Sequence, residues 1–235
     1  MTLFAIADPH LGFGVDKPMY IFGSRWTNHE RRLEENWLTS VGPDDTVLIP
    51  GDISWAMQLQ DALPDLRFLN RLPGRKILSK GNHDYWWSSL SKLEKLCRAE
   101  GLDSFIFLRN NSLLVPPDRI ICGTRGWILP DDPEFGQADE KIYLREAGRL
   151  RLSLESAAPL RQPDRKLVAC LHFPPFGREC RPTLFTDLLN EFAVDSCVFG
   201  HIHGGTVYDD LAGPPGTVAY SLVSADYLGF KPLRL

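Results

Sequence analysis

The 235-residue sequence lacks the features of several broad protein classes. No apolar stretch approaches the roughly 20 residues of a membrane-spanning helix, and no basic segment with a following apolar run marks the N-terminus as a signal peptide. Lys and Arg form no runs, and the formal net charge is −4, so bulk charge does not favour binding a nucleic-acid backbone. We expect a cytoplasmic protein without membrane contact that meets nucleic acid only as a substrate.

Cysteine is also sparse, and its spacing forms no recognisable pattern. The five cysteines are scattered without a Cys-x-x-Cys pair, and Cys122, Cys170 and Cys197 lie inside apolar runs. This pattern predicts reduced core residues and no disulfide framework. The composition, 43% apolar and 24% charged, is that of a globular domain. With no linker or internal repeat, we expect one domain over residues 1–235.

Short apolar runs alternate with amphipathic stretches, which is typical of an α/β domain with buried strands. The predicted strands cover residues 3–7, 46–49, 76–78, 119–122, 166–171, 197–199 and 217–220. The predicted helices cover residues 27–41, 88 or 89 to 101, 139–156, 182–192, and 55–72 with an interruption at Pro64. Thr27 and Glu30 are expected to form a capping box for the first helix.

The six histidines are the most informative residues. Nearly every one follows the C-terminal end of an apolar run, as do two aspartates and an asparagine. The carboxyl ends of the strands converge on the ligand crevice in open α/β sheets, so these side chains are expected to meet. Imidazole, carboxylate and amide ligands together suit Mn, Fe or Zn. The candidate metal ligands are Asp8, His10, Asp52, Asn82, His172, His201 and His203.

Seven ligands are too many for one ion but fit two divalent ions if one carboxylate bridges them. Glycines before Asp52, Asn82 and His201 are consistent with tight turns that allow close approach. Pro9 is expected to push Asp8 toward an extended conformation. His29 lies apart from the strand ends, and we expect it to be a solvated residue at a helix start.

In its motifs, the chain resembles the calcineurin-like metallophosphoesterase superfamily, and in particular its compact bacterial-type predicted phosphohydrolases. The resemblance rests on the ordered series Asp8-x-His10, Gly51-Asp52, Gly81-Asn82-His83-Asp84, His172 and Gly200-His201-x-His203. It implies an α/β fold with a central β-sandwich flanked by helices in four αββα layers. The dimetal site would lie at the C-terminal ends of the strands. The segment after Asp52 lacks the second Asp and the Arg of the Ser/Thr protein phosphatases, which argues against that branch.

The resemblance also implies residue roles. Asp8, His10 and His203 would hold one ion, Asn82, His172 and His201 the other, and Asp52 would bridge them.

The implied activity is hydrolysis of a phosphate mono- or diester of a small phosphorylated substrate. A metal-bridging hydroxide would attack phosphorus in line, and His83 would assist the leaving group. Asp84 is either a catalytic support for His83 or a cap of the following helix. The alternatives are a phosphodiesterase or nuclease acting on nucleic acid or cyclic nucleotides, and a non-catalytic metal-binding scaffold with the same fold. The complete ligand set favours an enzyme.

Loops around the metals are expected to select the substrate, and three are long enough to do so, residues 11–26, 124–137 and 173–181. The candidate phosphate contacts are Arg25, Arg125, Arg178 and Arg181. A candidate aromatic wall for a base or sugar comprises Trp26, Trp55, Tyr85, Trp86 and Trp87. Two alternatives stay open: Arg125 as a structural ion-pair partner, and packing of residues 85–87 onto the following helix.

Overall fold

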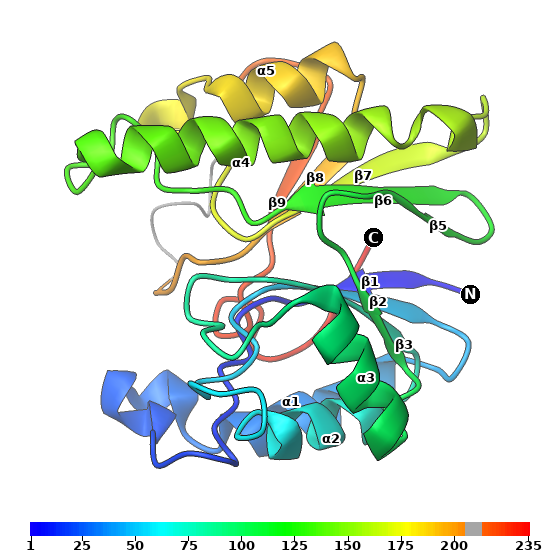
Figure 1. Ribbon diagram of the computed structural model, residues 1–235, viewed down its shortest axis with the longest axis vertical. Helices are drawn as coiled ribbons and strands as arrows, with labels where there is room; N and C mark the ends of the chain where they lie inside the picture. The colour runs from blue at the N-terminus through cyan, green and yellow to red at the C-terminus, as the bar shows by residue number, and fades with distance from the viewer. Residues whose placement is uncertain (205–212) are drawn as a thin grey trace.

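Two five-stranded sheets lie face to face in the computed structural model, which describes residues 1–204 and 213–235 (Figure 1). The first sheet, in the order β10-β1-β2-β3-β4, contains β1 (Leu3–Ala5), β2 (Thr46–Pro50), β3 (Arg75–Ser79), β4 (Phe105–Phe107) and β10 (Leu233–Arg234). The second, in the order β5-β6-β7-β8-β9, contains β5 (Leu113–Val115), β6 (Arg119–Thr124), β7 (Lys166–Leu171), β8 (Ser196–Phe199) and β9 (Ala219–Leu222). The α/β sandwich expected from the sequence is confirmed.

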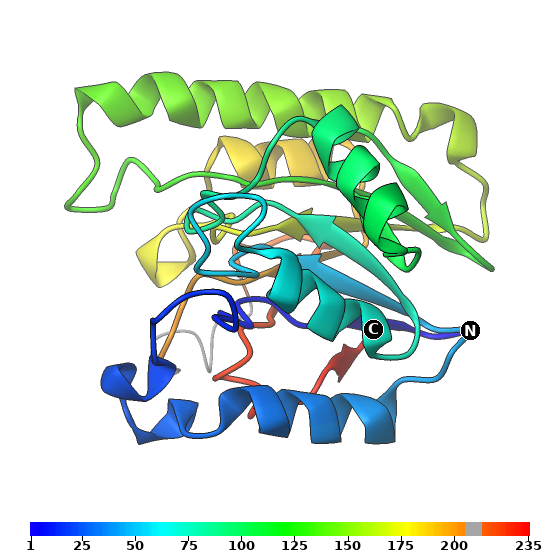
Figure 2. The same cartoon turned by 60° about the horizontal axis from the view of Figure 1, so that its bottom comes forward.

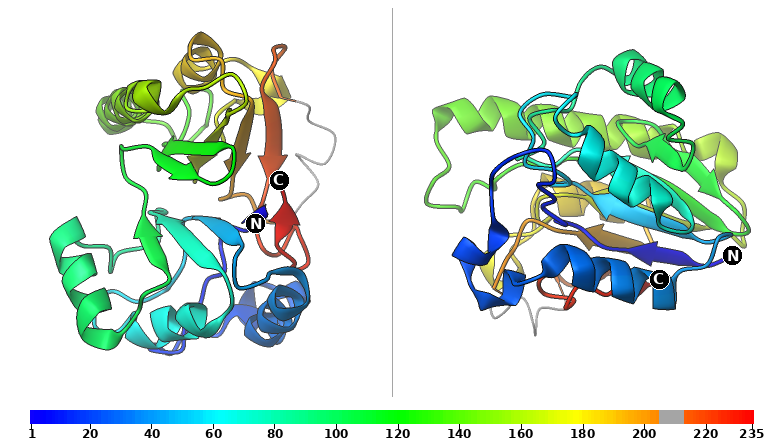
Figure 3. Two further views of the ribbon diagram at one scale, coloured as in Figure 1. Left: turned by 90° about the vertical axis from the view of Figure 1, so that its right-hand side faces the viewer. Right: turned by 90° about the horizontal axis from the view of Figure 1, so that it is seen from below.

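Helices cover the outer face of each sheet (Figure 3, left). The first sheet carries α1 (His29–Ser40), α2 (Leu63–Arg71) and α3 (Leu90–Glu100), and the second carries α4 (Gln137–Glu155) and α5 (Leu184–Glu191). Short 3₁₀ turns lie at Met19–Phe22, Ser24–Trp26, Ala158–Leu160 and Arg178–Cys180. No helix in the described part of the chain is long and apolar enough to cross a membrane.

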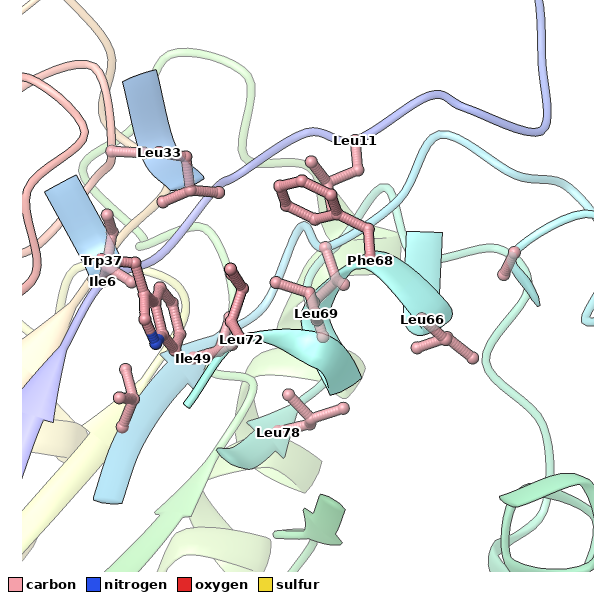
Figure 4. Close-up of a cluster of buried hydrophobic side chains, with 14 of the residues drawn as sticks. Ile6, Leu11, Leu33, Trp37, Ile49, Leu66, Phe68, Leu69, Leu72 and Leu78 are labelled. Atoms are coloured by element: carbon pink, nitrogen blue, oxygen red, sulfur yellow. The ribbon is translucent and has the colours of Figure 1, made fainter. Parts of the chain in front are cut away.

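Both faces of the central strands are buried, which explains their continuous apolar sequences. In β2, Val47 and Ile49 point into the core between sheet and helices, whereas Leu48 points into the layer between the two sheets. Figure 4 shows Ile49 among side chains of α1 and α2, including Leu33 and Phe68. The alternation along one strand therefore packs both layers at once.

Nearly all strand pairs are parallel, so their carboxyl ends lie at a common edge. β1 to β4 run parallel to one another, as do β6 to β9, while β10 and β5 pair antiparallel at an edge of their sheets. The loops that follow β1 and β2 gather at one end of the sandwich (Figure 2). This edge is where the sequence predicts the ligand site.

Two details of the predicted helices are wrong. Helix α1 begins at His29 after a left-handed Asn28 that makes no side-chain cap hydrogen bond, so the capping box between Thr27 and Glu30 does not form. Residues 55–62 are not helical, because Pro64 lies in the first turn of α2 and opens the helix instead of interrupting one.

Candidate metal centre

The predicted ligands meet at the carboxyl edge of the two sheets. Each follows a parallel strand, since Asp8 and His10 follow β1, Asp52 follows β2, Asn82 follows β3, His172 follows β7, and His201 and His203 follow β8. They form two groups, each with ligand atoms within 4.8 Å of one another. The first group contains Asp8, His10 and His203, and the second contains Asp52, His172 and His201.

Asn82 completes the second group. Its Oδ1 lies 2.6 Å from Nε2 of His172 and 3.0 Å from Nδ1 of His201. Asp52 lies between the groups, with Oδ2 at 3.5 Å from Nε2 of His172 and 3.8 Å from Nε2 of His10. One carboxylate oxygen thus reaches a ligand of each group, which is the position of a bridging ligand.

Hydrogen bonds outside the two groups fix the direction of the imidazole lone pairs. Nδ1 of His172 lies 2.9 Å from the carbonyl oxygen of Pro50. A carbonyl only accepts, so Nδ1 carries the proton and Nε2 presents its lone pair to the group. Nδ1 of His203 lies 2.9 Å from Oδ1 of Asp226 in the same way. Such carboxylate–histidine pairs orient metal ligands and raise their basicity.

Two buried polar atoms at the first group have no hydrogen-bond partner among the described residues, and both belong to predicted ligands: Oδ1 of Asp8 and Nδ1 of His10. The other carboxylate oxygen of Asp8 accepts from the backbone N–H of His201 and the hydroxyl of Ser224. The Nε2 atoms of His10 and His203 face each other at 3.3 Å. A cation complements the two acceptors of this group, Oδ1 of Asp8 and Nε2 of His203, whose proton is on Nδ1. Nitrogen and oxygen ligands suit Mn, Fe or Zn. The residues therefore fit a metal pair.

The electrostatics of the site point the same way. Burial raises the pKa of Asp8 well above its usual range, against the lowering effect of His203, and burial also raises the pKa of Asp52. Burial lowers the pKa of both His172 and His201 to about 3, so both are neutral ligands. Burying two ionised carboxylates away from water costs free energy unless positive charge lies beside them.

The backbone at Asp8 differs from the expectation. Its φ is 55°, in the left-handed region, so the predicted extended conformation is wrong. The chain turns sharply after β1 because the N–H of Asp8 donates to Gly51 and the N–H of His10 donates to Asp52. The predicted close approach at glycines is confirmed, since a Cβ on Gly200 would overlap the Asp8 carboxylate.

His83 lies at the edge of both groups. Its backbone N–H donates to Oδ1 of Asp52 at 2.8 Å, and its half-buried ring lies 4.6 Å from the Trp55 ring. Burial lowers the pKa of His83, with Asp52 opposing the shift. The side chain therefore faces the open side of the site instead of a ligand group.

Asp84 is fully buried and binds two loops together. Its carboxylate accepts from the N–H groups of Gly81, Ile53 and Ser54 and from the indole N–H of Trp86. Burial raises its pKa to about 7, and Asp52 adds to the rise. The alternative of a helix cap is wrong, because α3 begins after Ser89. Among the described residues, Asp84 makes no hydrogen bond to the His83 ring.

A cleft of about 380 Å³ opens beside the first group. Three of the predicted substrate contacts line it, Arg25, Trp26 and Trp55, together with His83. The other lining residues are His10, Met19, Phe22, His203, Gly204 and Asp226. Trp55 stacks on the His10 ring with 4.7 Å between centroids, and Arg25 contacts Asp226 at 3.4 Å. The cleft wall is thus mainly aromatic, with one cation.

The remaining predicted substrate contacts lie elsewhere. Arg125 pairs with Glu146 at 3.8 Å and stacks on Trp127, which agrees with the ion-pair alternative. Arg181 is exposed and pairs with Glu179 at 3.1 Å, and the side chain of Arg178 lies outside the described part of the structure.

The aromatic run after His83 does not form a wall of the cleft. The prediction of Trp86 as a substrate contact is wrong, because its indole is buried in the core and bonded to Asp84. Trp87 packs against the same core, and Tyr85 is exposed. The packing alternative holds for these two tryptophans.

The prediction that His29 is a solvated residue is also wrong. It is only 2% exposed, because its ring packs between Trp26 and Phe230. Its Nε2 lies 3.3 Å from the carbonyl oxygen of His10. Asp226 was missed altogether, although it follows β9 as the other acids follow their strands. Its position after a predicted strand is the sequence feature by which Asp226 could have been found.

Comparisons with known proteins agree with this geometry. A sequence profile described as Calcineurin-like phosphoesterase matches residues 1–205. A phosphopantetheinyl hydrolase from Mycobacterium tuberculosis is similar in structure, with a TM-score of 0.60 and 15% identity over 100% of this chain and 95% of that chain. A protein from Thermus thermophilus is similar with a TM-score of 0.57 and 12% identity, over 99% of this chain and 97% of that chain. A protein of unknown function from Aquifex aeolicus is similar with a TM-score of 0.54 and 16% identity, over 99% of this chain and 95% of that chain. No curated protein sequence matches the chain, and at these identities the structures establish the fold alone.

Proposed function

Because the chain belongs to the calcineurin-like phosphoesterase family, we propose that it is a metal-dependent hydrolase of phosphate esters. The observation that carries the proposal is the position of Asp52, whose carboxylate lies within 3.8 Å of a histidine of each ligand group. Two bound divalent ions would supply Lewis-acid stabilisation of the phosphoryl group and lower the pKa of coordinated water. Such chemistry requires both groups to be complete, as they are here.

The protein residues divide into holding and reacting groups. We assign Asp8, His10 and His203 to one ion, and Asn82, His172 and His201 to the other, with Asp52 between them.

His83 has no place in either group, and its ring faces the cleft. It is positioned to donate a proton to the leaving oxygen of an ester held there. Asp84 supports it indirectly by fixing the loop that carries Asn82 and His83.

The cleft indicates the class of substrate. Trp26, Trp55, Met19 and Phe22 all line the cleft beside the ligands. Apolar contacts of this kind favour the organic group of a small phosphorylated molecule over a bare phosphate. We therefore propose a phosphate ester of a small organic group with planar or apolar parts.

Turnover by metal-reconstituted protein tests the proposal. Metal-free protein is loaded with Mn²⁺, Fe²⁺ or Zn²⁺ and assayed with p-nitrophenyl phosphate, bis-p-nitrophenyl phosphate and phosphopantetheine, the last because of the name of one structural relative. We expect Asp52→Asn to lower kcat at least 100-fold through loss of the bridge, and Asp44→Asn, an exposed carboxylate, to leave it unchanged. No turnover with any metal, or equal turnover in wild type and Asp52→Asn, contradicts the proposal. The absence of turnover with every metal would favour the non-catalytic scaffold. Faster turnover of bis-p-nitrophenyl phosphate than of p-nitrophenyl phosphate would favour the phosphodiesterase.

His83 requires a separate measurement. General acid catalysis contributes roughly 10²–10⁴-fold, and it matters most when the leaving oxygen is basic. His83→Ala should therefore lower kcat more for phenyl phosphate than for p-nitrophenyl phosphate, with metal content unchanged. An equal loss on both substrates would contradict the role as leaving-group acid.

A further inference from the structure

A second cavity, of about 360 Å³, lies next to the candidate metal centre. The 80–89 segment contributes to both cavities, since His83 lines the aromatic cleft while Lys80 and Trp87 line this one. The rest of the lining comes from the same segment, the end of β3, the chain after β4, the end of β6 with the residue after it, and helix α4. These further residues are Ser79, Ser88, Ser89, Leu108, Arg109, Asn110, Thr124, Arg125, Arg145, Glu146 and Arg149.

The lining is strongly cationic in a chain whose formal net charge is −4. The cations are Lys80, Arg109, Arg125, Arg145 and Arg149, and the one acidic side chain of the lining is Glu146. These six groups carry five positive charges and one negative charge. The cavity therefore has a formal charge of +4.

The ion pairs within the cavity do not neutralise it. Glu146 is only 1% exposed, and its Oε1 lies 2.6 Å from Arg149, 3.8 Å from Arg125 and 3.9 Å from Arg145. Its other oxygen accepts from the Thr124 hydroxyl. One carboxylate thus serves three guanidinium groups.

Two of the cations have no ion-pair partner in the described part of the chain. Within the described residues, the side chains of Lys80 and Arg109 make no salt bridge or hydrogen bond to a protein group. Ser88, Ser89 and Asn110 add neutral hydrogen-bond donors beside them. Lys80 and Arg109 therefore leave two positive charges in the lining that no acidic group of the described residues pairs.

We propose that this cavity binds a phosphate-type anion of two or more negative charges. Guanidinium groups bind phosphate oxygens through paired hydrogen bonds, and several of them around one cavity favour a polyanion over chloride. The anion is either the distal phosphate of a substrate whose scissile ester lies at the metals, or a separate small phosphate compound.

The cavity is joined to the metal centre through the backbone. Lys80 lies two residues before Asn82 in the chain. The carbonyl oxygen of Arg125 accepts from the N–H of His172 at 3.0 Å. The cavity therefore borders the loop that carries Asn82 and a second loop, after β6, that is hydrogen-bonded to His172.

Calorimetric titration with inorganic pyrophosphate tests the proposal on metal-free protein, in which the phosphate cannot bind through the ions. The variant is Arg109→Gln with Arg149→Gln, since both side chains are exposed. Glu146 then loses its partner at 2.6 Å but keeps Arg125, Arg145 and Thr124. The control is Arg151→Gln, which removes one positive charge from α4, as Arg149→Gln does, but whose side chain pairs with Glu191 outside the cavity. Thermal unfolding monitors the fold of each protein.

We expect wild type and Arg151→Gln to bind one pyrophosphate, and the double variant to bind at least 10-fold more weakly. Absence of binding by wild type at millimolar pyrophosphate, or equal binding by all three proteins, overturns the proposal. This titration does not depend on turnover, so it stands or falls separately from the proposed activity.

The source of the anion is decided on metal-loaded protein. If the anion is the distal phosphate of a substrate, the double variant lowers the ratio of kcat/KM for a nucleoside diphosphate to that for p-nitrophenyl phosphate. If it is a separate compound, this ratio stays constant while pyrophosphate binding is lost. Either result is consistent with the anion site, and the comparison shows which of the two compounds occupies it.

Discussion

The interaction between Asp226 and His203 predicts that one metal site can be weakened without touching a ligand. The Asp226 side chain is fully buried, and its carboxylate accepts from Nδ1 of His203 at 2.9 Å and from the N–H of Gly204 at 3.2 Å. Burial raises the pKa of Asp226, but the hydrogen bond and charge of His203, the N–H of Gly204 and the hydrogen bond from Arg25 together outweigh it, and the net pKa is lowered. Asp226 is therefore charged at neutral pH. Asp226→Asn keeps the shape and removes the charge.

The size of the effect follows from this single contact. A hydrogen bond to a charged group contributes about 1.5–3 kcal/mol and a neutral one about 0.5–1.5 kcal/mol, so the substitution removes roughly 1–1.5 kcal/mol from the orientation of His203. The carboxylate also makes Nε2 a stronger donor, and loss of such partners typically weakens metal binding by about 10- to 100-fold. We expect a weakening within that range, at the site of Asp8, His10 and His203 only.

Calorimetric titration with Mn²⁺ or Zn²⁺ measures the effect as two binding phases in wild type. Asp226→Asn should weaken one phase, Asn82→Ala the other, and the exposed control Asp103→Asn neither. If Asp226→Asn weakens both phases equally, or neither, then Asp226 does not act through His203 and the assignment of separate ligand groups is refuted.

Two further predictions concern the fold. Burial lowers the pKa of Lys76 to about 8, so the folded state binds fewer protons than the unfolded state between about pH 8 and 10.5, and its stability should rise with pH across this window by at most about 3 kcal/mol. Urea unfolding should show a flatter pH dependence for Lys76→Met than for the exposed control Lys92→Met, and equal curves would contradict the burial. Leu33 is fully buried in α1, whereas Leu38 is 58% exposed on the same helix. Leu33→Ala should cost about 2–5 kcal/mol of unfolding free energy and Leu38→Ala less than about 1 kcal/mol, and similar losses would contradict the packing.

The long buried strands could be predicted from the sequence because each is a continuous apolar run flanked by polar residues. The run 166–171 matches β7 (Lys166–Leu171) at both ends, and the run 46–49 extends by one residue in β2. The missed strands are β4, β5 and β10, with 3, 3 and 2 residues. Runs this short have no periodicity of their own, and each of these strands depends on a neighbour that pairs with it.

The ligands could be predicted because strand ends place them, whatever the rest of the fold does. The surroundings of the ligands could not, because they depend on contacts between distant segments. His29 is buried by Phe230, which lies near the other end of the chain, and Trp86 is drawn inward by its bond to Asp84. A single contact of this kind decides whether a polar or amphipathic residue is buried or exposed. The local sequence pattern does not contain that information.

The backbone at the ligands shows how the fold itself sets the site. Asp8, His10, Asp52 and His201 all have positive φ, at 55°, 45°, 50° and 70°. Each such residue costs on the order of 1 kcal/mol, and such conformations persist only where the surroundings enforce them. Here the enforcing contacts are hydrogen bonds between ligand loops: His10 N–H to Asp52, and His201 N–H to the Asp8 carboxylate. The loops hold one another in the turned conformation, so the arrangement of the ligands is imposed by protein contacts and does not depend on the ions alone.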